Sequence, residues 1–469
     1  MVEPLFCRDG LDGTAGGYAP PSWRPVPAPL ARPGTACHAC PPRGPCRGPR
    51  GGDPRDLAQV GWGVVFAAGD RDAAAVREAL RPLLELRREQ ASGGGRTLYR
   101  ELAGEAGYRA GENKQAFLAR HGVGPGPAAP ERMPYYLLLV GDPEALPYSF
   151  QYQLDVQYAV GRLWFETLDE YRRYARSVVA AERGECRREA RVAIFAPRHP
   201  DDPKTALVTR RLAVPLAEWL ASRHGAWTTE AAIGDAATKP RLGRWLGGDE
   251  TPALLFTASH GLLFPEGHPR QRPFQGALVC REWPGPRACA GPIPVAQAFS
   301  ADDVGDGAAP HGLIAFHFAC YSAGTPAHDD FSPRRRPCRL APRGFLARLP
   351  QRLLGHPRGG ALAVVGHIER AWECSIEWPG AGPQIQVFED ALDRLLTGYP
   401  IGAAMQPFAE RYAELAADLS VELAAMLHGH EPDALTLAAM WTACHDARNY
   451  LVVGDPAVRL VPPAAEQIQ

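Results

Sequence analysis

Two strand-like runs of this sequence end in side chains that can carry out nucleophilic chemistry. The run ALLFTA, residues 253–258, leads toward His260-Gly261, and the run LIAFHFA, residues 313–319, ends at Cys320. A cysteine thiolate is a strong nucleophile, and a nearby imidazole can take its proton and later protonate a departing amine. In open parallel sheets, ligands bind beyond the carboxyl ends of the strands. If the two runs are neighbouring strands, His260 and Cys320 share one site.

Each residue also has an ordinary structural interpretation. A lone cysteine at a strand end is more often a small buried apolar side chain, and a histidine before glycine is often a turn residue. Taken together, 60 positions apart on consecutive strand ends, His260 and Cys320 favour a catalytic pair. Gly261 has no side chain, so its backbone N–H, like that of Cys320, can approach a developing oxyanion.

The other reactive residue types fit structural roles better. His317 lies three positions before Cys320 in the same run, so we expect it on the opposite face as a hydrogen-bonded interior histidine. Cys37 and Cys40, with Cys46 further on, could hold a metal, but a closed zinc site needs about four ligands, and a loop with free thiols is the better interpretation. The sequence has no G-x-S-x-G, G-x-x-x-x-G-K-[ST] or H-E-x-x-H motif. We therefore expect no metal and no cofactor.

The elements that must position the pair alternate along the chain. From residue 61, apolar strand-like runs are separated by helical patterns, which predicts an α/β layer fold with a mainly parallel sheet. We divide the chain into a Pro/Gly-rich and partly disordered segment (1–56), an N-terminal α/β subdomain (57–200) and a catalytic subdomain (201–469). Two tyrosine-led runs, 135–147 and 449–462, both enter Gly-Asp-Pro. They are either a common strand-to-turn solution used twice or a mark of two related subdomains.

Charge and composition exclude some function classes. The 469 residues carry a formal net charge of −1, which gives no bulk attraction to nucleic acid or to an anionic membrane. No apolar run approaches the roughly 20 residues that span a bilayer. The first residues lack a basic region followed by an apolar core, so we expect that there is no secretory signal. We therefore expect a cytoplasmic location, where the thiols are reduced.

The order of these runs resembles the gingipain-type cysteine peptidases, relatives of the caspases and the CHAT-domain proteases. The resemblance covers about residues 135–462, through the segments LLLVGDPEALP, LDVQYAVGRL, LLFTASHG, IAFHFACYSAG, GALAVVGHIERAW and LVVGDPAVRL. It implies a three-layer caspase/gingipain-like α/β fold with His260 as general acid/base and Cys320 as nucleophile. It also implies that Gly261 supplies an oxyanion N–H and that Trp372 walls the pocket for the residue before the scissile bond.

The sequence departs from that family in two places. Arg198 and His199 stand where the resemblance implies a carboxylate that holds the histidine, and Asp201 and Asp202 are the alternatives nearby. Thr209 stands where members that cut after arginine carry an aspartate, so arginine specificity does not carry over.

Three glutamates lie near the predicted pocket loop. Glu369, Glu373 and Glu377 either favour a basic or polar substrate residue or are solvated surface carboxylates. The substrate-binding candidates are therefore Trp372, Glu369 and Thr209.

We expect a cysteine endopeptidase that hydrolyses peptide bonds of a protein substrate through a Cys–His dyad. By analogy with intracellular proteases of this type, it serves bacterial signalling or defence, with a gasdermin-like pore former as one expected partner. The alternative is a catalytically silent peptidase-like scaffold that binds a protein partner. The basic loop with Arg334, Arg335 and Arg336 is either a processing or regulatory site or a solvated loop.

Overall fold

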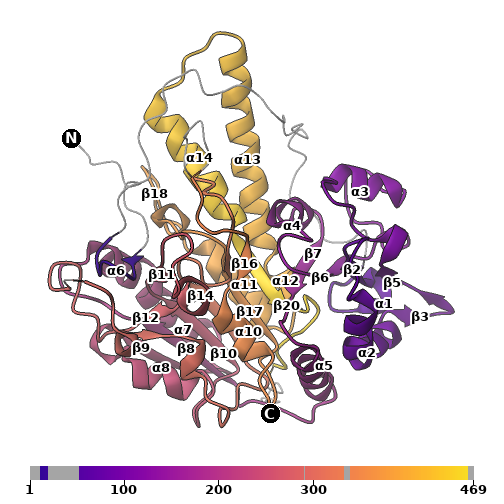
Figure 1. The fold of residues 1–469 in the computed structure, drawn as a ribbon, viewed down its shortest axis with the longest axis horizontal. Helices are drawn as coiled ribbons and strands as arrows, with labels where there is room; N and C mark the ends of the chain where they lie inside the picture. The colour runs from indigo at the N-terminus through magenta and orange to yellow at the C-terminus, as the bar shows by residue number, and fades with distance from the viewer. Residues whose placement is uncertain (1–10, 19–51, 290, 332–337, 463–469) are drawn as a thin grey trace.

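The computed structural model describes residues 11–18, 52–289, 291–331 and 338–462, which Figure 1 traces through the fold. Cys37, Cys40 and Cys46 lie outside the described residues, as do Arg334, Arg335 and Arg336, so the metal and processing hypotheses stay predictions. In the described part of the chain, no group of three or more His, Cys, Asp or Glu side chains is placed to hold a metal ion.

A ten-stranded sheet forms the centre of the molecule, and it confirms the prediction of a mainly parallel α/β fold. All neighbouring strands are parallel except the pair β17–β20. In spatial order the strands are β5 (Tyr99–Leu102), β2 (Trp62–Phe66), β6 (Tyr136–Val140), β7 (Ala159–Leu163), β20 (Tyr450–Gly454), β17 (Ala363–His367), β14 (Ile314–Phe318), β10 (Leu254–Ala258), β8 (Arg191–Ala196) and β9 (Thr228–Ile233).

Helices flank this sheet, and their cover explains the apolar runs of the sequence (Figure 1). Every residue of β2, β6, β7, β10, β14, β17 and β20 is buried, as expected for strands covered on both faces. The helices are α1 (Leu57–Val60), α2 (Ala73–Gln90), α3 (Lys114–Arg120), α4 (Tyr148–Asp155), α5 (Leu168–Glu182), α6 (Pro203–Val208), α7 (Val214–Arg223), α8 (Lys239–Trp245), α9 (Gln271–Phe274), α10 (Arg348–Leu354), α11 (Gln386–Leu396), α12 (Ile401–Ala404), α13 (Gln406–Leu427) and α14 (Ala434–Arg448).

Short two-stranded sheets and single helical turns complete the fold. The two-stranded sheets are β1 (Leu11–Asp12) with β11 (Leu262–Leu263), β3 (Ser92–Gly93) with β4 (Arg96–Thr97), β12 (Leu278–Val279) with β13 (Ala298–Phe299), β15 (Gly324–Thr325) with β16 (Phe345–Leu346), and β18 (Glu377–Trp378) with β19 (Gly382–Pro383). The short turns are η2 (Gly104–Ala106), η3 (Thr209–Ala213), η4 (Gly234–Ala236), η5 (Val295–Gln297), η6 (Ala301–Asp303) and η7 (Glu373–Ser375).

The sheet runs without interruption through both predicted subdomains. The C-terminal strand β20 returns to its middle, between β7 and β17. Strand β8 lies between β10 and β9, so it belongs with the strands after residue 200 although it precedes that boundary in the chain. The predicted boundary at residue 200 therefore cuts off one strand of the sheet region that carries the candidate pair.

The two Gly-Asp-Pro segments follow β6 and β20, and their aspartates make different contacts. Asp142 accepts the backbone N–H groups of Glu144 and Ala145 within its own turn. Asp455 is fully buried, where it accepts the indole N–H of Trp62 at 2.9 Å and pairs with Arg87 at 2.8 Å. The shared motif therefore closes a local turn in the first segment and forms a buried ion pair in the second.

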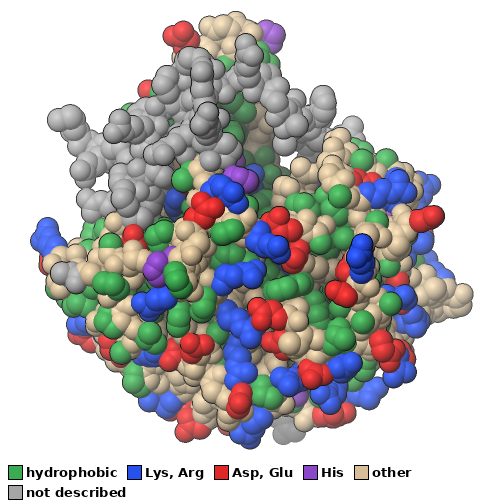
Figure 2. Space-filling view, viewed as in Figure 1, with side chains coloured by type: hydrophobic (Ala, Val, Ile, Leu, Met, Phe, Trp, Pro, Cys, Tyr) green, Lys and Arg blue, Asp and Glu red, His purple; other side chains and the backbone are tan. Residues whose placement is uncertain are grey.

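The surface carries charges of both signs. Basic and acidic side chains are interspersed on the face shown in Figure 2, in keeping with 51 Lys and Arg against 52 Asp and Glu in the whole sequence. None of the helices in the described ranges has the length and apolar character of a membrane span.

His317 is the interior histidine that the sequence predicts. It is fully buried in β14, and its Nδ1 lies 2.8 Å from the hydroxyl of Thr257 on the neighbouring strand. Burial lowers the pKa of His317 to about 3, because the charged form loses its hydration. Since the unfolded-state pKa is about 6.5, its contribution to stability is complete above pH 6.5 and is lost progressively toward pH 3.

We therefore expect acidification from pH 7 to 4.5 to cost about 2–3 kcal/mol of unfolding free energy through His317 alone. Urea unfolding at several pH values measures this loss. The His317→Asn variant cannot titrate but keeps a polar atom near Thr257, so its stability should fall less steeply with acid. Equal slopes for both proteins would contradict the assignment.

Candidate active site

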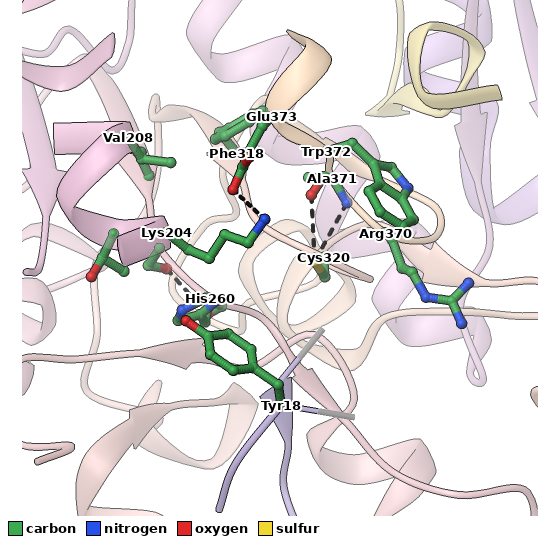
Figure 3. Close-up of a pocket in the computed structure, with 13 residues that line it drawn as sticks. Tyr18, Lys204, Val208, His260, Phe318, Cys320, Arg370, Ala371, Trp372 and Glu373 are labelled. Carbon is green, nitrogen blue, oxygen red and sulfur yellow. Dashed lines mark hydrogen bonds and ion pairs between the residues drawn. The ribbon is translucent and has the colours of Figure 1, made fainter. Parts of the chain in front are cut away.

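His260 and Cys320 lie at the same edge of the sheet, as the sequence predicts. Strands β10 and β14 are parallel neighbours, and Ala258 is paired with Phe318. Each candidate residue follows two positions after these paired ends. Both side chains line one cleft, and Figure 3 labels them among the residues around it. The cleft encloses about 660 Å³, part of which is open solvent.

Cys320 sits at a sharp turn after β14, with its side chain 8 % exposed. The next residue, Tyr321, is fully buried with φ at 58°, a left-handed conformation that costs a non-glycine residue roughly 1–3 kcal/mol. Its N–H donates to the carbonyl of Glu369 at 2.6 Å, which holds the turn. The N–H of Ala371 points at the Cys320 sulfur at 3.4 Å, and such a donor favours the thiolate.

His260 is held by a carboxylate. Its Nε2 lies 2.8 Å from Oδ2 of Asp202. A carboxylate only accepts hydrogen bonds, so Nε2 must carry the hydrogen and Nδ1 is the nitrogen with a free lone pair. The imidazole is thereby fixed in the tautomer that can take a proton at Nδ1.

Asp202 is well prepared to carry a negative charge. It is the N-cap of α6, where it accepts the N–H of Lys204 at 3.0 Å and the hydroxyl of Thr205 at 2.8 Å. Burial raises the pKa of Asp202, but the charge of His260 and hydrogen bonds from His260, Tyr18 and Thr205 outweigh burial and hold that pKa well below its usual range.

Of the two alternatives that the sequence left open, Asp201 and Asp202, it is Asp202 that holds His260. Asp201 points outward, half exposed, and pairs with Arg287 at 3.3 Å. His199 is buried against the carbonyl of Trp283, and burial lowers the pKa of His199 to about 4. The sequence signal for Asp202 is Asp-Pro at a helix start, an N-cap followed by proline at the first helical position.

Gly261 lies directly against the backbone of the candidate nucleophile. A methyl carbon built on it would stand 1.8 Å from the carbonyl oxygen of Cys320, so only glycine fits. The N–H of Leu262 bonds to Ala277 and the N–H of Val279 bonds to the carbonyl of His260, so the Gly261 amide lies between these two bonds. Gly261 and Cys320 are thus in direct backbone contact. The predicted oxyanion role of their N–H groups stays a prediction.

Trp372 lines the cleft, where the sequence places it. Its backbone N–H donates at 2.9 Å to the carboxylate of Asp446, a fully buried residue of α14. The same carboxylate accepts the hydroxyl of Ser375 at 2.5 Å. The wall of the cleft that carries Trp372 is therefore anchored on α14.

Two predicted substrate-binding residues do not line the cleft. Glu369 is fully buried, bonds to Arg370 at 2.5 Å and accepts the N–H of Asp330, so it is neither a pocket residue nor a solvated carboxylate. Burial raises the pKa of Glu369 well above its usual range. Thr209 begins η3, a π-helical turn, and is not among the residues that line the cleft, whereas the preceding Val208 is.

Tyr18 is a cleft residue that the sequence does not reveal. Its hydroxyl donates to Asp202, and its ring meets the ring of His260 edge-on with centroids 5.9 Å apart. It is brought there by β1, which pairs with β11 just after Gly261, and by Leu11, which is fully buried. Part of the segment predicted to be loop or disorder is thus built into the candidate site.

Comparison with known proteins yields only remote matches. No family model and no curated protein matches the chain. A solved structure of a protease matches with a TM-score of 0.47 and 12 % identity over 86 % of this chain and 80 % of that one. The Arg-specific cysteine proteinase gingipain R matches with a TM-score of 0.47 and 11 % identity over 86 % and 78 %. A complex of RgpB pro- and mature domains from Porphyromonas gingivalis gives 0.43 and 11 % over 85 % and 80 %. What this chain can do therefore depends on its own residues.

Proposed function

We propose that this chain is a cysteine peptidase in which Cys320 attacks the peptide carbonyl and His260 transfers the proton. One observation carries the proposal: adjacent parallel strands deliver a thiol and a carboxylate-bound imidazole into the same cleft. Asp202 keeps Nδ1 of that imidazole free to act as the base.

The reaction follows from these roles. Nδ1 of His260 takes the thiol proton, and the sulfur of Cys320 bonds to the carbonyl carbon, whose oxygen becomes an oxyanion facing the N–H groups of Gly261 and Cys320. When this intermediate collapses, the C–N bond breaks and His260 gives its proton to the amine. A water molecule then loses a proton to His260 and attacks the thioester, which releases the acid and restores the thiol.

The alternative is a silent scaffold that binds a protein partner through the cleft. Its best support in the sequence is the lack of an evident carboxylate for the histidine. Asp202 supplies that carboxylate at 2.8 Å, which removes this support. The peptidase and the scaffold can be distinguished by the reactivity of Cys320, which only the peptidase function requires.

A peptide probe with a thiol-reactive acyloxymethyl ketone distinguishes them. We expect the full-length chain to be modified on Cys320, with peptide mapping by mass spectrometry as the measurement, and the Cys320→Ala variant to stay unmodified. Cys338→Ala is the matched control, because Cys338 is a partly exposed thiol away from the cleft, and its loss should leave the labelling intact. An unlabelled wild type, or labelling that survives Cys320→Ala, would support the scaffold.

A further inference from the structure

An ion pair spans the cleft beside the candidate nucleophile. Lys204 rises from the first turn of α6, and Glu373 begins η7 on the wall that carries Trp372. Figure 3 shows Lys204 extending toward Glu373, and the two side chains form a salt bridge. They are largely buried, with side-chain exposures of 19 % and 14 %, and both line the cleft.

The backbone at each partner is connected to the residues that position the candidate site. The backbone N–H of Lys204 donates to Asp202, and Asp202 holds His260. Glu373 follows Trp372, and the backbone N–H of Trp372 donates to Asp446. The pair therefore joins the helix that carries Asp202 to the wall that carries Trp372.

Helix stability does not explain the lysine. A positive charge in the first turn of a helix opposes the helix dipole and costs about 0.3–1 kcal/mol at an exposed site. The position of Lys204 makes sense through its partner on the opposite wall. The pair therefore belongs to the cleft rather than to α6.

Each ionisable side chain that lines the cleft in the described ranges has a partner of opposite charge or a hydrogen-bond partner. Lys204 pairs with Glu373, and the imidazole of His260 is hydrogen-bonded to Asp202. Arg370 is bound to Asp329 at 2.9 Å and to Glu369. The other lining side chains are largely apolar, among them Val208, Ala258, Phe318, Ala371 and Trp372.

We propose that the Lys204–Glu373 pair determines specificity, by making the pocket beside Cys320 accept an uncharged apolar side chain and reject charged ones. This inference rests on the proposed peptidase function. A charged substrate residue would lose its hydration in a cleft where each opposite charge is already neutralised, which is costly. Rejection by a compensated pair is therefore as important as attraction by the apolar wall.

Matched acyloxymethyl ketone probes that differ only in the residue next to the reactive group test the proposal. Second-order rate constants for labelling of Cys320 give the ranking of Ala, Val, Arg and Asp probes. We expect the wild type to react about tenfold or more faster with the Ala and Val probes than with the Arg and Asp probes.

The single variants should shift the ranking in opposite directions. Lys204→Met leaves the Glu373 carboxylate unpaired, and the Arg probe should gain about tenfold relative to the Ala probe. Glu373→Gln leaves the ammonium unpaired, and the Asp probe should gain similarly. The double variant has no charge at this place and should keep the wild-type ranking, although its overall rate can fall.

The outcomes separate this inference from the proposed function. Labelling of Cys320 with one unchanged ranking in all four proteins, or a wild type that reacts fastest with Arg or Asp, overturns the specificity role alone. No labelling with any probe overturns the peptidase function, and the specificity role with it. A merely structural ion pair would change stability and overall rate but not the ranking, so thermal melts of each variant accompany the rates.

Discussion

Replacing Asp202 by asparagine is expected to lower peptide hydrolysis by about 10²–10⁴-fold. The carboxylate now requires Nε2 of His260 to carry the hydrogen, which leaves Nδ1 as the base. An amide can present its NH₂ group to Nε2, which would move the hydrogen to Nδ1 and remove the base. It also cannot stabilise the imidazolium that forms when His260 takes the thiol proton.

The fold should survive this change, because asparagine caps helices about as well as aspartate. Asp201→Asn is the matched control: it makes the same chemical change one position away, on an exposed side chain that pairs with Arg287 at the surface, and we expect activity within about twofold. Hydrolysis of a fluorogenic peptide, with the thermal melt of each variant, measures both effects. Equal losses in the two variants would show that Asp202 does not hold the base.

The sequence is informative where the signal is local. Runs such as LLFTA and IAFHF predict buried strands because most of their residues are apolar. In the structure every residue of both strands is buried. A parallel sheet then places the residues after each strand at one edge, so the meeting of His260 and Cys320 follows from topology alone. The N-cap character of Asp202 is also local, but its contact with His260 depends on α6 following β8, the neighbour of β10.

The rest depends on long-range packing. Tyr18 reaches Asp202 across 184 positions, and nothing in its own surroundings indicates that partner. Glu369 is close in sequence to Trp372, which lines the cleft, but its side chain is fully buried, where Arg370 joins it to Asp329. Thr209 stands at the start of a π-helical turn, a local irregularity that helical periodicity does not reveal.

The candidate site is therefore assembled from separate parts of the chain. The N-terminal segment contributes Tyr18, α6 contributes Asp202 and Lys204, two strand ends contribute His260 and Cys320, and α14 anchors the wall with Trp372. Small shifts of the strand ends relative to each other should then matter more than changes in any single wall residue.

Gly261 offers the sharpest test of that conclusion. We expect Gly261→Ala to lower hydrolysis by about 10²-fold or more, since a displacement of about 1 Å between reacting groups has that effect. The added carbon would stand 1.8 Å from the carbonyl oxygen of Cys320 and 3.1 Å from its nitrogen. Both are backbone atoms, so the turn after β10 and the turn after β14 must separate to make room.

The matched control is Gly225→Ala, at an exposed position where an added carbon meets no atom within 4 Å. Its activity should equal that of the wild type. Thermal melts separate a displaced site from a lost fold: Gly261→Ala should remain folded at 25 °C while it hydrolyses the peptide poorly and labels slowly at Cys320. Full activity in Gly261→Ala would mean that the two strand ends are not in the contact that brings His260 and Cys320 to one cleft.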